Sequence, residues 1–234
     1  MPPVAGFEES IQKRIREEGR EIRPNTYAVK IPVKAGEAIG KVGGSSLVVG
    51  FDWEVYDKNV ENFFVHPEKY PNKDIHAVHF IQYCEESLKE KLLAKIPRTA
   101  EPRIGRFSYD QPGKLVGNWF LEGTTPEQAK TDWSRHLSFA YHHLDPSKIL
   151  ISIGGYLTEK PYTFEVYGNK PDPATIDVSS GKVVYWLKGA DVNPDAPRIT
   201  LLVQMIDDER IKVEVFKGWV KNPEFTENAR IYTR

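Results

Sequence analysis

The sequence is poor in cysteine, in long apolar runs and in any excess of one charge. Cys84 is the single cysteine among 234 residues, which excludes an internal disulfide and a zinc site made of cysteines alone. No apolar run approaches the roughly 20 residues of a membrane-spanning helix, so we expect no membrane span. Lys and Arg number 32 against 33 for Asp and Glu, whereas phosphate-binding proteins usually carry a basic excess. We therefore do not expect nucleic acid as a partner.

Aromatic residues, in contrast, are plentiful. The chain has 11 Tyr, 11 Phe and 5 Trp, and such rings favour strands. From residue 114 onward apolar residues alternate with polar ones between regularly spaced turns, a pattern typical of an antiparallel sandwich or barrel. The predicted strands are 115–121, 136–144, 148–153, 162–166, 176–178, 183–187, 199–206, 211–216 and 229–234. Eight or nine such strands can close on themselves, which removes exposed sheet edges.

The first half of the chain has a different pattern. The spacing predicts a helix over 7–18, a strand over 27–33 and strand structure over 46–57. A second helix is predicted from Ile75 to Ile96, with Asp74 as its N-cap and Pro97 after its end. Residues 98–106 resemble a linker, so we expect one domain over 1–100 and another over 107–234.

The run VKAGEAIGKVG at 33–43, followed by GFDWEVYD at 50–57, resembles the late part of the lysostaphin-type zinc peptidases. The resemblance covers about residues 27–57 and implies a barrel-sandwich-hybrid-like β module. In that family the second strand supplies a His-x-His pair, because alternate residues of a strand face the same side and can share one zinc. The corresponding positions here are Gly50 and Asp52. The resemblance therefore implies a degenerate module without the metal.

The sequence offers a second possible metal site. His76 and His79 are three residues apart on the predicted second helix, a spacing that can share a metal, with Cys84 or Glu86 as further ligands. The alternative is one packed histidine and one surface histidine. We favour that alternative because no third ligand is identifiable, and we expect no metal or other cofactor.

Gly117-Asn118-Trp119 at the first strand of the predicted barrel resembles the Gly-x-Trp motif of lipocalins and related calycins. The resemblance implies that Trp119 plugs the closed end of the barrel. The chain as a whole, with PGKLVGNWF at 112–120 and LSFAYHHLDPSKILISIG at 137–154, resembles uncharacterised prokaryotic proteins in which a peptidase-like module precedes a calycin-like barrel. This implies a mainly β fold, α+β overall, and a secreted or cell-envelope setting, although the first residues lack the pattern of a secretory signal.

A calycin-like barrel implies a cup for a small ligand. The alternation places Phe139, Tyr141, Phe164 and Tyr185 inside with Trp119 as the floor, and His143 near a strand end at the open mouth. The alternative is that the rings fill the barrel completely. The remaining polar candidates are expected to be solvated surface residues rather than a catalytic set: His136, His142, Glu165 and Glu214.

Three hypotheses about function follow. The first is a non-catalytic binding protein whose barrel holds a small apolar or amphipathic ligand or a glycan fragment. The second is a hydrolase with an unrecognised metal site around His76 and His79 or an active site at the barrel mouth. The third is a structural or interaction module. The sequence leaves the ligand and the oligomeric state open.

Overall fold

A computed structural model describes residues 32, 34, 36, 37 and 54–234 of the chain. Contacts divide the chain into two compact units, Met1–Trp53 and Glu54–Arg234, of which the second is described here. The predicted helix over 7–18, the strand over 27–33 and most of the peptidase-like run lie outside the described residues. The division into 1–100 and 107–234 stays a prediction as well, because residues 1–31, 33, 35 and 38–53 of its first part are not described.

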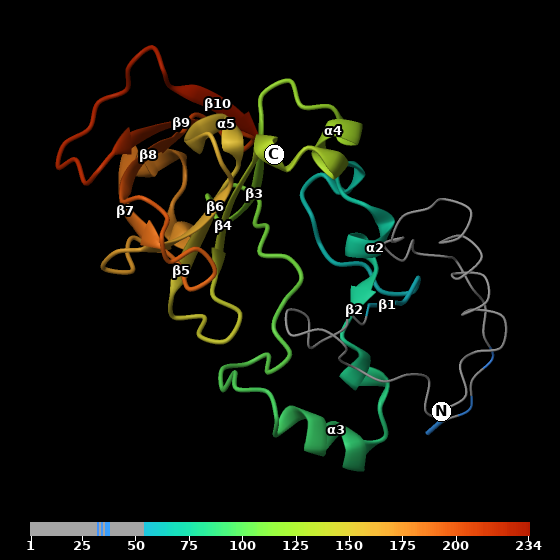
Figure 1. Cartoon of the computed structure of the whole chain (residues 1–234). Helices are drawn as coiled ribbons and strands as arrows, with labels where there is room; N and C mark the ends of the chain where they lie inside the picture. Colours follow the sequence, from blue (N-terminus) through green and yellow to red (C-terminus); the bar gives the residue numbers. More distant parts are fainter. Residues whose placement is uncertain (1–31, 33, 35, 38–53) are drawn as a thin grey trace, which may run out of the picture. The chain divides into compact units, whose positions relative to one another are not determined.

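The second unit is built on a closed barrel of eight antiparallel strands (Figure 1), in the order β10-β3-β4-β5-β6-β7-β8-β9. Consecutive strands from β3 to β10 are neighbours, and β10 closes the ring against β3. The prediction of a mainly β fold with an eight- to nine-stranded antiparallel barrel is confirmed. The strands are β3 (Gly117–Leu121), β4 (His136–Tyr141), β5 (Ile149–Ile153), β6 (Tyr162–Val166), β7 (Lys182–Gly189), β8 (Ile199–Met205), β9 (Arg210–Lys217) and β10 (Arg230–Thr233).

The core lies inside this barrel. The register places Trp119 opposite Leu137, and Phe139 opposite Ile151. These side chains have no solvent-accessible surface, as the two-residue alternation of a strand requires when one face is buried. The inward positions predicted from the sequence are therefore correct for these strands.

The strand predicted over 176–178 is wrong. Two short 3-10 helices occupy this part of the chain, η4 (Pro173–Thr175) and η5 (Val178–Ser180). The Asp172 and Asp177 carboxylates cap them by accepting from backbone N–H groups at 2.9 and 3.0 Å, and such local bonds compete with strand pairing. The Ile176 carbonyl instead accepts from the Leu115 N–H at 3.0 Å. The segment therefore packs against the residues that lead into β3.

The long helix predicted from Ile75 to Ile96 is also wrong. The chain forms α2 (Asn72–Ile75), β2 (Ala77–Val78), η2 (Phe80–Tyr83) and α3 (Glu86–Leu93) in its place. Val78 pairs with Val55 of β1 (Val55–Tyr56), and the Asn62 side chain donates to the carbonyls of Asp74 and Ala77. Tertiary pairing thus overrides a helical apolar pattern. Asp74, the predicted N-cap, lies inside α2.

The segment before the barrel packs on the barrel wall. It includes the short helix η1 (Pro67–Lys69). The rings of Phe64 and Tyr70 are stacked with centroids 3.9 Å apart, and Tyr70 meets Phe120 of β3 edge to face. His66 Nε2 lies 2.8 Å from a Glu209 carboxylate oxygen. These contacts tie residues 64–70 to the barrel.

Three more short helices follow β3 and β5: α4 (Pro126–Thr131), η3 (Trp133–Arg135) and α5 (Gly155–Thr158). Thr125 and Gln128 form a capping box at the start of α4, with Pro126 in its first turn. Across the described part of the chain, no helix is both long enough and apolar enough to span a membrane.

Candidate binding pocket beside the barrel

Four of the predicted ligand-binding residues lie inside the barrel: Trp119, Phe139, Phe164 and Tyr185. Each has an exposed fraction of 0%. A side chain without accessible surface borders no space as large as a water molecule, so side chains fill the barrel around these four residues. Ligand binding by them stays a prediction, and it would require the core to open.

Trp119 is held in place at the end of the barrel where β3 begins. Its Nε1 donates to the Leu115 carbonyl at 2.8 Å, and the Arg234 guanidinium lies 4.2 Å from its ring centroid. Arg234 also donates to the Val116 carbonyl at 2.9 Å and lies 3.7 Å from Asp110 Oδ1. These contacts fix the ring against the residues that lead into β3.

The other two predicted residues, Tyr141 and His143, lie at that same end. Gly117, the first residue of β3, pairs with Phe139, and the strands are antiparallel, so residues after Phe139 extend past the start of β3. The sequence predicts His143 at the open mouth, opposite Trp119. This prediction is wrong, because His143 lies at the end of the barrel where β3 begins. Tyr141 donates its hydroxyl to Asp172 and meets Tyr109 edge to face at 5.1 Å.

Tyr141 and His143 line a pocket of about 350 Å³ between the barrel end and residues 96–106. This volume lies within the range of small-molecule sites. The lining contains three arginines, two histidines and several apolar or aromatic side chains, and it contains no Asp or Glu. The lining residues are His79, Ile96, Arg98, Arg103, Ile104, Gly105, Arg106, Tyr109, Tyr141, His143 and Leu144.

Arg98 is the most buried of the three arginines, with an exposed fraction of 3%. Its Nε donates to the Pro102 and Ala100 carbonyls at 2.8 and 3.1 Å, and its Nη1 donates to the His143 carbonyl at 2.8 Å. No Asp or Glu of the described chain forms an ion pair with it. Among the described residues, only neutral oxygens compensate this buried cation. Burial of a charge without an ionic partner is costly in a medium of low dielectric constant.

Arg103 and Arg106 add positive charge beside it. Arg103 Nη2 donates to the Leu93 and Ile96 carbonyls at 3.0 and 3.2 Å, while its buried Nε has no hydrogen-bond partner. Arg106 is exposed and makes no hydrogen bond or ion pair with residues 54–234. The pocket thus presents three guanidinium groups, of which that of Arg106 has no partner among residues 54–234.

The possible metal pair at His76 and His79 depends on both residues lying on one helix, and the structure does not show that helix. The two residues do not share a helix, because His76 follows α2 and His79 precedes η2. His76 Nδ1 lies 2.8 Å from the Val60 carbonyl, and His79 Nδ1 accepts from the Ile81 N–H at 3.4 Å. Within the described ranges, no group of three His, Cys, Asp or Glu side chains is placed to hold a metal. Of the two, His79 alone lines the pocket, where burial lowers its pKa.

The expected surface residues divide into two kinds. Glu165 forms an ion pair with Lys188 at 3.0 Å on the outer wall. Glu214, in contrast, is buried at 4% exposure and accepts from the Thr226 N–H and hydroxyl at 2.7 and 2.6 Å. His136, His142 and Glu165 are partly buried. The expectation of a solvated surface position is therefore wrong for Glu214, and the other three side chains are only partly exposed.

Comparison of the chain with protein-family models, curated proteins and solved structures finds no match. The case for a function therefore depends on the geometry of this chain alone.

The sequence carries one signal for this pocket. Residues 98–106 contain three arginines and one acidic residue, Glu101, although their Pro and Gly content predicts a linker. The cationic residues gather at one place only because the Arg98 and Arg103 side chains fold back onto neighbouring carbonyls. A count of charges could have identified the segment but not the pocket.

Proposed function

We propose that the chain is a non-catalytic binding protein that takes a small amphipathic anion in the arginine-lined pocket beside its barrel. The observation that supports this most directly is the buried Arg98, which has only carbonyl partners among the described residues and lies next to Arg103 and Arg106. The proposal keeps the amphipathic ligand expected from the sequence but moves it from the barrel interior to the barrel end.

The charge of the pocket favours a carboxylate or phosphate group. A guanidinium keeps its proton at all physiological pH values and presents a planar fork of donors that matches such oxyanions. An anion here would offset the cost of the buried Arg98 charge. Two described acids near the pocket already have partners: the Glu101 carboxylate accepts from the Arg103 N–H at 3.1 Å, and Asp172 accepts from the Tyr141 hydroxyl.

The rest of the lining favours an apolar or aromatic body attached to that anion. Tyr109 and Tyr141 form an edge-to-face pair, and Ile96, Ile104 and Leu144 complete the wall. Aromatic and aliphatic side chains with a few polar groups are typical of small-molecule sites. We therefore expect an aromatic carboxylate or phosphate to bind better than either an inorganic anion or a neutral aromatic molecule.

Three probes of similar shape test this proposal by calorimetry or ligand-observed NMR: benzoate, phenyl phosphate and the neutral benzamide. We expect saturable binding of at least one anion and not of benzamide. Added salt should weaken that binding because ions screen charges that are partly exposed.

Arg106→Gln is the informative variant, because Arg106 has no described partner and its loss should leave the fold intact. We expect it to weaken anion binding by about tenfold. Arg230→Gln removes an exposed arginine of β10, outside the pocket, and serves as the matched control. Equal binding of benzamide and benzoate, or equal effects of the two variants, would rule the proposal out.

Two family relationships belong to this proposal as well. We propose that the barrel is calycin-like, supported by Gly117-Asn118-Trp119 at the start of its first strand and by the closed eight-stranded architecture. We also propose that residues 27–57 form a degenerate lysostaphin-like module, supported by the sequence pattern alone.

A further inference from the structure

A second concave surface lies on the outer wall of the barrel, away from the arginine-lined pocket. It is a groove of about 360 Å³ over β3, β4, β5 and β6. None of its lining residues is Asp, Glu, Lys or Arg. The lining residues are Asn118, Trp133, His136, Ser138, Ser152, Ile153, Gly154, Pro161, Tyr162, Thr163 and Asn193.

The floor of the groove is a row of small polar side chains across four neighbouring strands. The register pairs Asn118 with Ser138, Ser138 with Ser152, and Ser152 with Thr163. Their sequence neighbours Trp119, Leu137 and Ile151 are buried in the core, so the row faces outward by alternation. Because serine and threonine are short, the row leaves a depression that is lined by hydroxyl groups.

Several of these polar groups have unused hydrogen-bonding capacity. The Ser152 and Thr163 hydroxyls lie 3.1 Å apart, and each keeps further donor or acceptor positions. Asn193 accepts from the Thr163 N–H at 2.8 Å through its Oδ1, which fixes the amide and leaves its NH₂ group available. Ser138 makes no side-chain hydrogen bond with another described residue. The floor can therefore bind several hydroxyl groups at once.

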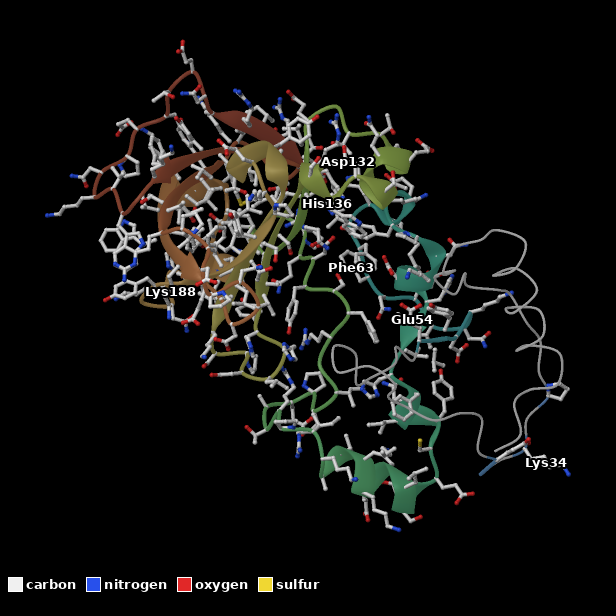
Figure 2. All side chains as sticks on the ribbon, in the orientation of Figure 1. Lys34, Glu54, Phe63, Asp132, His136 and Lys188 are labelled. Carbon is white, nitrogen blue, oxygen red and sulfur yellow. The ribbon has the colours of Figure 1, made fainter. Side chains whose placement is uncertain are left out.

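One wall of the groove is an exposed tryptophan in a fixed position. Trp133 is 64% exposed and is the first residue of η3. The Asp132 carboxylate caps this helix by accepting from the Ser134 N–H at 3.2 Å. A Cβ added at Gly154 would lie 2.3 Å from the Ser134 carbonyl oxygen, so this turn packs directly on the end of β5. Figure 2 shows Asp132 and His136 close together at the barrel edge, where η3 leads into β4.

The chemistry of the groove fits a sugar ring. An aromatic face carries partial negative charge and attracts the C–H groups of a pyranose, while the hydroxyl groups of the same ring pair with serine, threonine and amide side chains. The uncharged lining disfavours phosphate-bearing ligands, which need cations. We propose that this groove binds a neutral saccharide of one or two rings, with Trp133 as the stacking platform.

Saturation-transfer NMR with cellobiose and N,N′-diacetylchitobiose at millimolar concentration tests the proposal. We expect saturable binding of at least one disaccharide, with transfer concentrated on the C–H protons of one ring. Trp133→Ala should weaken binding by about tenfold or more, and Trp133→Phe should retain part of it. Phe63→Ala is the matched control, because Phe63 is 58% exposed and does not line the groove.

A second variant does not depend on the tryptophan. Ser138→Ala removes one hydroxyl of the floor without adding bulk, so it should also weaken disaccharide binding while Phe63→Ala does not. Absence of saturable binding with both disaccharides would overturn the proposal, as would binding that Trp133→Ala leaves unchanged. Uridine serves as a probe of a different stacking ligand, and binding of uridine alone would overturn the assignment to a saccharide. None of these outcomes bears on the proposed anion binding, because the arginine-lined pocket is made of different residues.

Discussion

Gly117 has two properties at the residue scale that other amino acids could not share. Its φ of +115° lies where side chains are rarely tolerated, and a Cβ there would lie 2.3 Å from Asp110 Oδ1 and 2.9 Å from Arg234 Nη1. The glycine thus allows the Asp110 and Arg234 side chains to approach the first strand of the barrel. In this chain, the glycine of Gly-x-Trp is explained by packing at the barrel end.

Gly117→Ala should therefore destabilise the protein by about 3 kcal/mol or more, since it combines backbone strain with overpacking. Urea unfolding measures the change. Gly123→Ala is the matched control, because Gly123 also has a positive φ of +78° but nothing within 4 Å of its added Cβ. We expect the control to lose only about 1 kcal/mol. Equal losses for both variants would show that packing around Gly117 contributes nothing.

Asp110 connects separate elements of the fold. Its Oδ1 accepts from the Asn118 N–H of β3 at 2.8 Å, and its Oδ2 accepts from the Val65 N–H at 3.2 Å. It is also the acid nearest the buried Arg234 that follows β10. One carboxylate therefore joins the segment before the barrel, the first strand and the last strand, whose pairing closes the ring.

Asp110→Ala should cost about 3–5 kcal/mol, because it leaves the Arg234 charge buried without its partner and removes two hydrogen bonds. Asp110→Asn, which keeps one acceptor oxygen, should cost less. Asp191→Asn, at an exposed acid without an ion pair, controls for the loss of surface charge and should be nearly neutral. Denaturant midpoints and m-values measured for all three variants test the order, and a neutral Asp110→Ala would contradict it.

At the scale of the whole molecule, the barrel is a filled scaffold whose candidate sites lie on its outside. The largest core side chains are fully buried, while the arginine-lined pocket and the polar groove lie at one end and on one wall.

Burial of titratable groups next to these sites makes the stability of the fold depend on pH. Burial lowers the pKa of His136 below its ordinary value of 6.5, against smaller opposing effects from Ala129 and Asp132.

The unfolded chain should therefore bind a proton at His136 near pH 6.5, whereas the folded chain takes it up only at lower pH. More protons are then bound in the unfolded state, so the free energy of unfolding falls as pH drops below 6.5. Burial of His79 acts in the same direction. We expect urea unfolding to show lower stability at about pH 5 than at about pH 7.5, and His136→Gln to reduce that difference. Stability that rises toward acid pH would contradict this.

The sequence by itself determined the barrel, because a closed antiparallel sheet with one buried face imposes a two-residue alternation that can be read locally. The α4 cap at Thr125 is equally local, since a capping box involves four consecutive residues. The sequence-based prediction failed at 75–96, where pairing of Val78 with Val55 overrides a helical pattern, and at 176–178, where aspartate caps replace a strand.

Only the tertiary structure decided where ligands could bind. In the sequence, residues 98–106 resemble a linker. They line a pocket because the Arg98 and Arg103 side chains fold onto carbonyls beside the barrel end, with the exposed Arg106 next to them. The outward row from Asn118 to Thr163 is visible only in the register of four strands, because its members are separated along the chain by turns and helices. Local patterns encode which face of a strand is buried, but sites on the other face depend on which strands become neighbours.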